Sequence, residues 1–272
     1  MRVALCQMRS GPDVEVNLEL ADRLLQEAAD RGAELAVLPE LFAYLGPPSR
    51  IPVVAEVVPD GPIATRIAEI ARAREMWVAA GSVPERGGDK VFNTAALFDP
   101  SGALAARYRK IHLFDVELPD QAPFRESAVY TEGAQLVTHQ AGPARVGFAI
   151  CYDLRFPELF RGLAALGAEV IVVPSQFQFA TGEAHWHTLV RARAIEDQCF
   201  VAAAAQWGPF GAPDEGRRSY GHSLVVDPWG RVLGEGPEEG DTVVVADLDL
   251  AEIRRVRTVL PALQHRRLGI TC

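Results

Sequence analysis

"GAELAVLPEL" at residues 32–41 returns in altered form as "GAEVIVVPSQ" at residues 167–176, and this pair of stretches decides the fold. Each begins with a glycine of the kind that ends a helix, continues as an apolar run typical of a buried strand, and contains a proline where that run ends. Two further pairs follow in the same order: "WVAAGSV" (77–83) with "FVAAAAQ" (200–206), and "NTAALFDPSGALAARYRK" (93–110) with "GHSLVVDPWGRVLGEG" (221–236). The second half of the chain therefore repeats the first.

Each half predicts the order strand, helix, strand, helix, strand and hairpin. In the first half we expect strands at 3–7, 35–38 and 77–83, and helices at 17–31 and from Pro62 onward. Strands that alternate with helices in two related halves predict an α/β fold, a four-layer α-β-β-α sandwich with an internal pseudo-twofold repeat.

Both predicted hairpins turn at the same kind of tetrad. Residues 99–102 and 227–230 read Asp-Pro-x-Gly, with proline and glycine at the positions that a tight turn favours. No linker, low-complexity tract or charge block divides the sequence, so we expect residues 1–272 to form a single domain.

Composition narrows the range of functions. The 272 residues are 49% hydrophobic and carry a net charge of −9, which is unfavourable for a nucleic-acid partner. The N-terminal apolar run is too short for a signal peptide and no stretch approaches a membrane span, so we expect a cytoplasmic protein without a membrane partner. Four scattered cysteines with no CxxC pair predict neither a disulfide framework nor a zinc site.

Three polar residues stand where apolar runs end. Cys151 lies in "RVGFAICYDLRFPEL" (145–159), Glu40 follows "ELAVLP", and Lys110 closes "ARYRK". Taken singly, Cys151 fits a core thiol, while Glu40 and Lys110 fit surface residues. Chain reversals at strand ends are, however, where α/β proteins place their chemistry.

The motifs around these residues resemble those of the nitrilase superfamily of carbon–nitrogen hydrolases. "LPE" (38–40), "YRKIHLFD" (108–115) and "CYDLRFPEL" (151–159) match in order and approximate spacing. The resemblance extends over essentially the whole chain, including "RARAIEDQCFVAAAAQ" and "YGHSLVVDPWG". The family fold is an α-β-β-α sandwich, in agreement with the repeat.

The resemblance implies a catalytic triad of Glu40, Lys110 and Cys151, with Glu126 of "FRES" orienting it. A thiol is weakly ionised at neutral pH, so it needs a neighbouring base, and Glu40 is expected to take and return its proton. Lys110 is expected to stabilise the oxyanion, with help from the backbone N–H of Tyr152. No cofactor is implied.

Arg155 is the expected anchor for a substrate carboxylate, which a guanidinium binds with two parallel hydrogen bonds. The alternative is a structural ion pair with Asp153 or Glu158. The resemblance to ω-amidase-type enzymes further implies substrate contacts by Phe177 and Thr181.

A metal site is not expected. "GEAHWHTLVRARAIE" (182–196) contains Glu183, His185 and His187, but histidines at i and i+2 do not share a helix face, and HExxH is absent. His187 is expected to have a structural role or to line the pocket wall. Relatives commonly carry glutamate at this position, and if that glutamate supports the triad, its replacement by His187 puts the support in doubt here.

Among the branches of the superfamily, the flanking motifs are most similar to the deaminated glutathione amidases. That branch implies cleavage of a linear amide of a 2-oxo acid through a thioester on Cys151, releasing 2-oxoglutarate and cysteinylglycine. The alternative is an ω-amidase, which would release ammonia from 2-oxoglutaramate or 2-oxosuccinamate. A non-catalytic interaction module is the third possibility, but its expected mark, loss of a triad residue, is absent. The resemblance also implies a homo-oligomer, a dimer or higher.

The stretch "WGPFGAPDEGRRSYG" (207–221) predicts a flexible loop at the pocket mouth. One of its two adjacent arginines, Arg217 or Arg218, is expected to meet the distal carboxylate of a dianionic substrate. The alternative is a solvated pair that balances Asp214 and Glu215.

Overall fold

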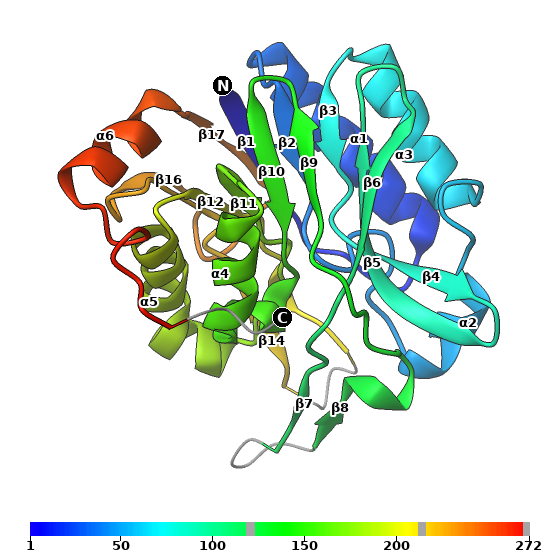
Figure 1. Ribbon diagram of the computed structural model, residues 1–272. Helices are drawn as coiled ribbons and strands as arrows, with labels where there is room; N and C mark the ends of the chain where they lie inside the picture. Colours follow the sequence, from blue (N-terminus) through cyan, green and yellow to red (C-terminus); the bar gives the residue numbers. More distant parts are fainter. Residues whose placement is uncertain (118–122, 212–215, 269–272) are drawn as a thin grey trace.

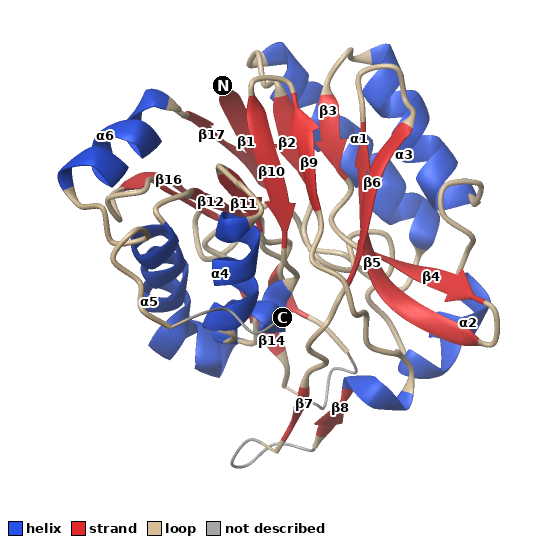
Figure 2. Ribbon diagram, in the orientation of Figure 1, coloured by secondary structure: helices blue, strands red, loops and turns tan. Residues whose placement is uncertain are grey.

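The computed structural model describes residues 1–117, 123–211 and 216–268. Two large β-sheets lie face to face with helices on their outer faces, as Figure 1 and Figure 2 show. The four-layer α-β-β-α sandwich predicted from the sequence is therefore confirmed.

The two sheets are built on the same plan. The first has seven strands, β17 (Thr242–Asp247), β1 (Arg2–Gln7), β2 (Leu35–Val37), β3 (Trp77–Ala79), β5 (Lys90–Phe98) and β4 (Val83–Gly87) in that order, with β6 (Leu104–Arg109) also paired to β5. The second has six, in the order β16 (Val232–Glu235), β15 (Leu224–Val226), β12 (Phe200–Ala203), β11 (Val170–Val172), β10 (Ala144–Phe148) and β9 (Thr138–Ala141).

In each sheet three parallel strands, β1–β2–β3 or β10–β11–β12, are flanked by antiparallel ones. The hairpins β5–β6 and β15–β16 then occupy matching places. This agreement confirms the internal repeat.

Helices α1 (Val14–Asp30) and α3 (Pro62–Ala73) cover the first sheet, and α4 (Pro157–Ala165) and α5 (Phe179–Asp197) cover the second (Figure 1). The remaining elements are short or peripheral: α2 (Ile51–Val54), α6 (Ala251–Val259), the 3-10 turns η1 (Pro48–Arg50), η2 (Glu126–Ala128) and η3 (Cys151–Arg155), and the strand pairs β7 (Asp115–Val116) with β8 (Phe124–Arg125) and β13 (Trp207–Pro209) with β14 (Arg218–Tyr220). In the described residues, no helix combines the length and the apolarity that a membrane crossing requires.

Local chemistry sets the ends of α1. The Asp13 side chain accepts hydrogen bonds from the N–H groups of Glu15 and Val16, at 3.0 and 3.3 Å, as an N-cap does. At the other end Gly32 has φ 74°, which a residue without a β-carbon adopts at little cost. The glycine that begins the repeated stretch is thus the helix terminator predicted for it.

Alternation along the strands builds two adjoining hydrophobic layers. In β1, Val3 and Leu5 point between the sheets, while Ala4 and Cys6 face α1 and α3. The inter-sheet layer draws residues from both halves of the chain, so neither half buries its sheet alone.

Two sequence predictions need correction. The strand expected at 77–83 ends at Ala79, because Gly81 turns the chain with φ 35° so close to Pro39 that a β-carbon would lie 2.0 Å from its carbonyl oxygen. The flexible loop predicted at 207–221 instead contains the antiparallel pair β13 and β14. Residues 212–215, with Asp214 and Glu215, lie outside the described residues, as does Cys272.

Candidate active site

A cavity of about 590 Å³ opens where β2 and β10 end. It is lined by the residues that the family resemblance nominated for the triad and its neighbours and for contact with the 2-oxo acid: Glu40, Lys110, Glu126, Cys151, Tyr152, Arg155, Phe177 and Thr181. Residues more than 130 positions apart in the chain therefore meet at one site, because the carboxyl ends of parallel strands share one edge of each sheet.

A buried charge cluster forms one wall of the cavity. Lys110 Nζ lies 2.8 Å from Oε1 of Glu40 and 2.8 Å from Oε2 of Glu126. The Asn93 amide donates to both carboxylates, at 2.9 and 3.0 Å, and the backbone N–H of Gln176 donates to Oε2 of Glu40 at 2.9 Å. These bonds fix the two acids on either side of one ammonium group.

The electrostatics of the cluster favour a neutral thiol beside an acid whose pKa is raised. Burial, and then the charge of Glu40, raise the pKa of the Cys151 thiol well above its ordinary value, although Lys110 opposes them. Burial also raises the pKa of Glu40, while Lys110 opposes that shift. For Lys110, burial disfavours the charge, but the neighbouring Glu126 and Glu40 outweigh it and hold the lysine pKa well above its usual value. Lys110 therefore stays cationic, and Glu40 is the group placed to exchange a proton with the thiol.

Cys151 adopts a left-handed backbone conformation, with φ 43°, at the first position of η3. Few residues other than glycine tolerate this region, and such strain collects at functional sites. The Cys151 N–H donates to the Pro174 carbonyl at 2.9 Å, and Sγ lies 3.4 Å from the Gln176 carbonyl oxygen. The thiol is thereby held at the cavity wall.

Asp153 secures the bend from inside the protein. Its fully buried carboxylate accepts hydrogen bonds from the Ile150 N–H at 2.8 Å, the Tyr108 hydroxyl at 2.7 Å and the His112 N–H at 3.0 Å. These partners explain why Arg155 has no ion pair with Asp153, and in the described chain it has none with Glu158 either. The structural alternative for Arg155 is not formed.

Arg155 lies over the aromatic floor of the cavity. Its guanidinium carbon is 5.1 Å from the centre of the Phe177 ring and 5.9 Å from that of Tyr152. Nη1 of Arg155 is 3.3 Å from Nδ1 of His185. A cation held by rings and one imidazole retains donors for a substrate carboxylate.

The adjacent arginines Arg217 and Arg218 lie in different surroundings. Arg217 lines the cavity with its guanidinium 5.5 Å from the ring centre of Phe124. Arg218 instead forms ion pairs with Glu238 at 3.0 Å and Glu239 at 2.6 Å. Of the two arginines, one of which is expected at the substrate tail, Arg217 lines the pocket and Arg218 does not.

His187 is not a pocket-wall residue. Its Nε2 lies 2.9 Å from Oε1 of Glu235, and the described residues that line the cavity do not include it. Glu183 and His185, its neighbours in the rejected metal motif, do not join this contact. Three residues other than His187, namely Asn93, Lys110 and Gln176, hydrogen-bond to Glu40.

Sequence reasoning missed some residues that shape the site. Asn93, Asp153 and Gln176 position the acids and the thiol, and the hydroxyl of Tyr130 is buried at the cavity with no hydrogen-bond partner in the described structure. Asn93 gave the clearest signal, a lone amide inside the apolar run "VFNTAALF".

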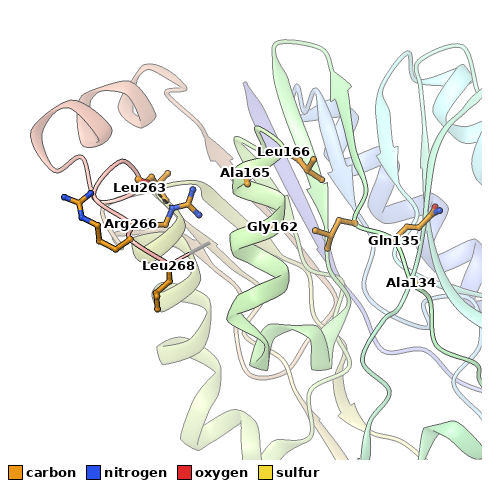
Figure 3. Close-up of a pocket in the computed structure, with 10 residues that line it drawn as sticks. Ala134, Gln135, Gly162, Ala165, Leu166, Leu263, Arg266 and Leu268 are labelled. Atoms are coloured by element: carbon orange, nitrogen blue, oxygen red, sulfur yellow. Dashed lines mark hydrogen bonds between the residues drawn. The ribbon is translucent and has the colours of Figure 1, made fainter. Parts of the chain in front are cut away.

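A second hollow, about 860 Å³, lies between α4 and the C-terminal segment (Figure 3). Gly162 and Ala165 of α4 line it, together with Leu166 just after that helix and with Leu263 and Arg266 of the C-terminal segment. The described residues that line this hollow include none of the nominated ones and no paired acid and nucleophile.

Comparisons with known proteins agree with this geometry. The profile of the family described as carbon–nitrogen hydrolase matches residues 2–258. The deaminated glutathione amidase of Mus musculus is 44% identical over 272 residues, covering 97% of this chain and 83% of the mouse protein. The omega-amidase NIT2 of Mus musculus is 37% identical over 269 residues, covering 99% of this chain and 96% of that protein.

A solved structure of an amidase mutant from Nesterenkonia sp. AN1 superposes with a TM-score of 0.82 at 32% identity, covering 98% of this chain and 94% of that one. That structure shows covalent addition of the acetamide moiety of fluoroacetamide at the active site cysteine. The chain belongs to the carbon–nitrogen hydrolase family, and its relatives include amidases.

Proposed function

We propose that this protein is a cysteine amidase that hydrolyses a linear amide of a 2-oxo acid, with deaminated glutathione as its substrate. One observation carries the proposal: Cys151, Glu40 and Lys110 converge in a cavity whose aromatic floor also holds Arg155. The mouse relative named for deaminated glutathione supports the choice of substrate.

In the proposed acylation step, the Cys151 thiol attacks the amide carbonyl while Glu40 takes the thiol proton. The developing oxyanion is stabilised by Lys110 and by the backbone N–H of Tyr152. Glu40 returns the proton to the leaving nitrogen, the C–N bond breaks, and the amine departs, leaving a thioester on Cys151.

In the proposed deacylation step, Glu40 removes a proton from water, and the resulting hydroxide attacks the thioester carbonyl. Collapse of the second tetrahedral intermediate breaks the C–S bond, and the proton held by Glu40 returns to sulfur. For deaminated glutathione the products are 2-oxoglutarate and cysteinylglycine. Glu126 holds Lys110 in place throughout, so it acts as a positioning residue.

Two arginines suit the two ends of this substrate. Arg155 is assigned to the carboxylate of the 2-oxo acid, and Arg217 to the carboxylate of the terminal glycine. An ω-amidase substrate such as 2-oxoglutaramate lacks the second carboxylate, so Arg217 separates the two candidate activities. The omega-amidase relative keeps that second candidate open.

The test compares kcat/KM for deaminated glutathione, 2-oxoglutaramate, an N-carbamoyl amino acid and a simple nitrile. We expect deaminated glutathione to be the best substrate. A preference for 2-oxoglutaramate would identify an ω-amidase, and turnover of none of the four would favour a non-catalytic module.

A pair of variants sharpens the comparison. Arg217→Ala should raise KM for deaminated glutathione and leave 2-oxoglutaramate nearly unaffected. Arg218→Ala is the matched control, because Arg218 is engaged by Glu238 and Glu239, and it should change neither KM. Equal effects of Arg217→Ala on both substrates would contradict the assignment of the tail site.

A further inference from the structure

Outside the cavity, the fold brings two imidazoles and a carboxylate together. His187 of α5, His222 after β14 and Glu235 at the end of β16 each present a ligand atom, and these atoms lie within 4.8 Å of one another. His187 Nε2 and His222 Nδ1 are each 2.9 Å from Oε1 of Glu235. The three residues come from separate elements and converge on one point.

We propose that His187, His222 and Glu235 bind a divalent late first-row transition-metal ion, of which zinc is the natural candidate. Two neutral imidazoles and one carboxylate form a donor set that zinc accepts, with further positions left to water. Calcium and magnesium prefer all-oxygen surroundings, so the two nitrogen donors select against them.

The ligands are accessible yet held in place. The side chains of His187, His222 and Glu235 are 35%, 21% and 38% exposed, so water can reach the ion and complete its coordination. The backbone of His222 is fixed with φ 53°, and its carbonyl accepts a hydrogen bond from the indole of Trp186 at 2.8 Å. Because Trp186 is fully buried and adjoins His187 in α5, it ties the positions of both histidines together.

The cluster also links three elements of the fold that are separated along the sequence. An ion at this place would join α5 to the end of β16 and to the turn that follows β14.

The role that follows is structural. None of the three ligands lines the cavity that contains Cys151, so the ion would take no part in the chemistry proposed there. An ion that binds only the folded state raises the free energy of unfolding as its concentration increases.

The experiment uses the full chain without a histidine tag, stripped with a chelator, dialysed and then titrated with zinc chloride. Bound metal is counted by mass spectrometry after gel filtration, and cobalt chloride gives an independent spectroscopic titration. We expect about one ion per chain and a rise in melting temperature with zinc.

His187→Ala and His222→Ala should each weaken zinc binding by more than the roughly 10- to 100-fold typical of losing an outer hydrogen bond at a zinc site, and should remove the rise in melting temperature. Glu235→Gln should also weaken zinc binding. Because it keeps the size of the side chain, a loss of binding in this variant would not reflect a folding defect. His265→Ala, which alters an exposed histidine outside the cluster, and Cys151→Ala should both bind zinc as the wild type does.

Unchanged zinc binding in His187→Ala and His222→Ala would overturn the site and leave a hydrogen-bonded cluster only. Loss of zinc from Cys151→Ala would also overturn it, because the metal would then lie at the thiol. Neither result bears on the proposed amidase activity, which is measured separately by product formation.

Discussion

At the scale of single residues, the site depends on a thiol held in a strained bend and on one ammonium shared by two acids. Cys151 keeps φ 43° because Asp153 and Pro174 accept hydrogen bonds from the N–H groups of Ile150 and Cys151 at the bend. Lys110 keeps its charge in a buried place because Glu40 and Glu126 both contact it. Removing Lys110 would leave two buried carboxylates without the cation that they share, which is costly.

Arg155 gives the first prediction. Arg155→Lys retains the positive charge but loses the planar fork that grips a carboxylate at two points. We expect a loss of substrate affinity of about 1.5–3 kcal/mol, seen as a higher KM for every 2-oxo acid amide, with a smaller effect on kcat. An unchanged KM in a variant with a normal circular dichroism spectrum would make Arg155 structural.

The nucleophile and the acids were accessible to sequence reasoning because each directly follows an apolar run, and strand ends meet in a parallel sheet. The separation of Arg217 from Arg218 was not accessible, since neighbouring residues on an extended chain point to opposite sides, and only the observed pairing of β14 assigns those sides. The partner of His187 was hidden for another reason, because Glu235 lies 48 positions away along the chain.

At the scale of elements, α5 positions both the cavity wall and the histidine cluster. Its Gly182 packs against Tyr220 of β14 so closely that a β-carbon would lie 2.4 Å from that side chain. This glycine is therefore required by close packing between α5 and β14. No clear helical pattern marks α5 in the sequence, because polar and apolar residues are mixed around the whole helix.

We predict that Gly182→Ala lowers the free energy of unfolding by about 1–2 kcal/mol, because overpacking outweighs the better helix propensity of alanine. Urea denaturation measures the change. Gly11→Ala is the matched control, since its β-carbon would meet no atom within 4 Å, and it should stay within about 0.5 kcal/mol of the wild type. Equal stability of the two variants would contradict the packing argument.

The contact between α4 and α5 predicts a dependence of stability on pH. Asp197 ends α5 with a fully buried carboxyl, and although Arg161 of α4 lies 3.0 Å from Oδ1, neither oxygen accepts a hydrogen bond within the described structure. Burial raises the pKa of Asp197 to about 7, against the opposing charge of Arg161. The folded state therefore prefers the protonated form.

Because this pKa is raised on folding, its contribution to stability is fully present below about pH 4 and is lost as the pH rises toward about 7. The loss amounts to at most about 4 kcal/mol. Asp197→Asn should remove this dependence of stability on pH. Urea unfolding of the two proteins at a series of pH values should then show the free energy of unfolding of the variant rising relative to that of the wild type as the pH increases. Parallel curves would refute the assignment to Asp197.

At the scale of the whole molecule, the two repeats share one hydrophobic layer and one active-site cavity. Val3 and Leu35 of the first half pack in the same layer as Phe148 and Val170 of the second. Neither half carries a complete set of site residues, because Glu40 and Lys110 come from the first repeat and Cys151 from the second. This distribution supports the expectation of a single domain.

We predict one cooperative unfolding transition, with the same midpoint by circular dichroism and by tryptophan fluorescence, because separation of the repeats would expose the shared layer. Light scattering after gel filtration should give the mass of a dimer or a higher homo-oligomer of the 29.5 kDa chain. Two resolved unfolding transitions would argue for separate domains. A monomeric mass would contradict the expected homo-oligomer.

The central claim is that Cys151 carries the acyl group during turnover. Rapid mixing with deaminated glutathione, acid quenching and mass spectrometry of the digested protein would locate that group, with Glu40→Gln used to slow its release. We predict an acyl adduct on the peptide containing Cys151, absent from Cys151→Ala and absent from the peptides of the buried Cys6 and Cys199. Turnover without any adduct on Cys151, or with undiminished rate in Cys151→Ala, would contradict the account.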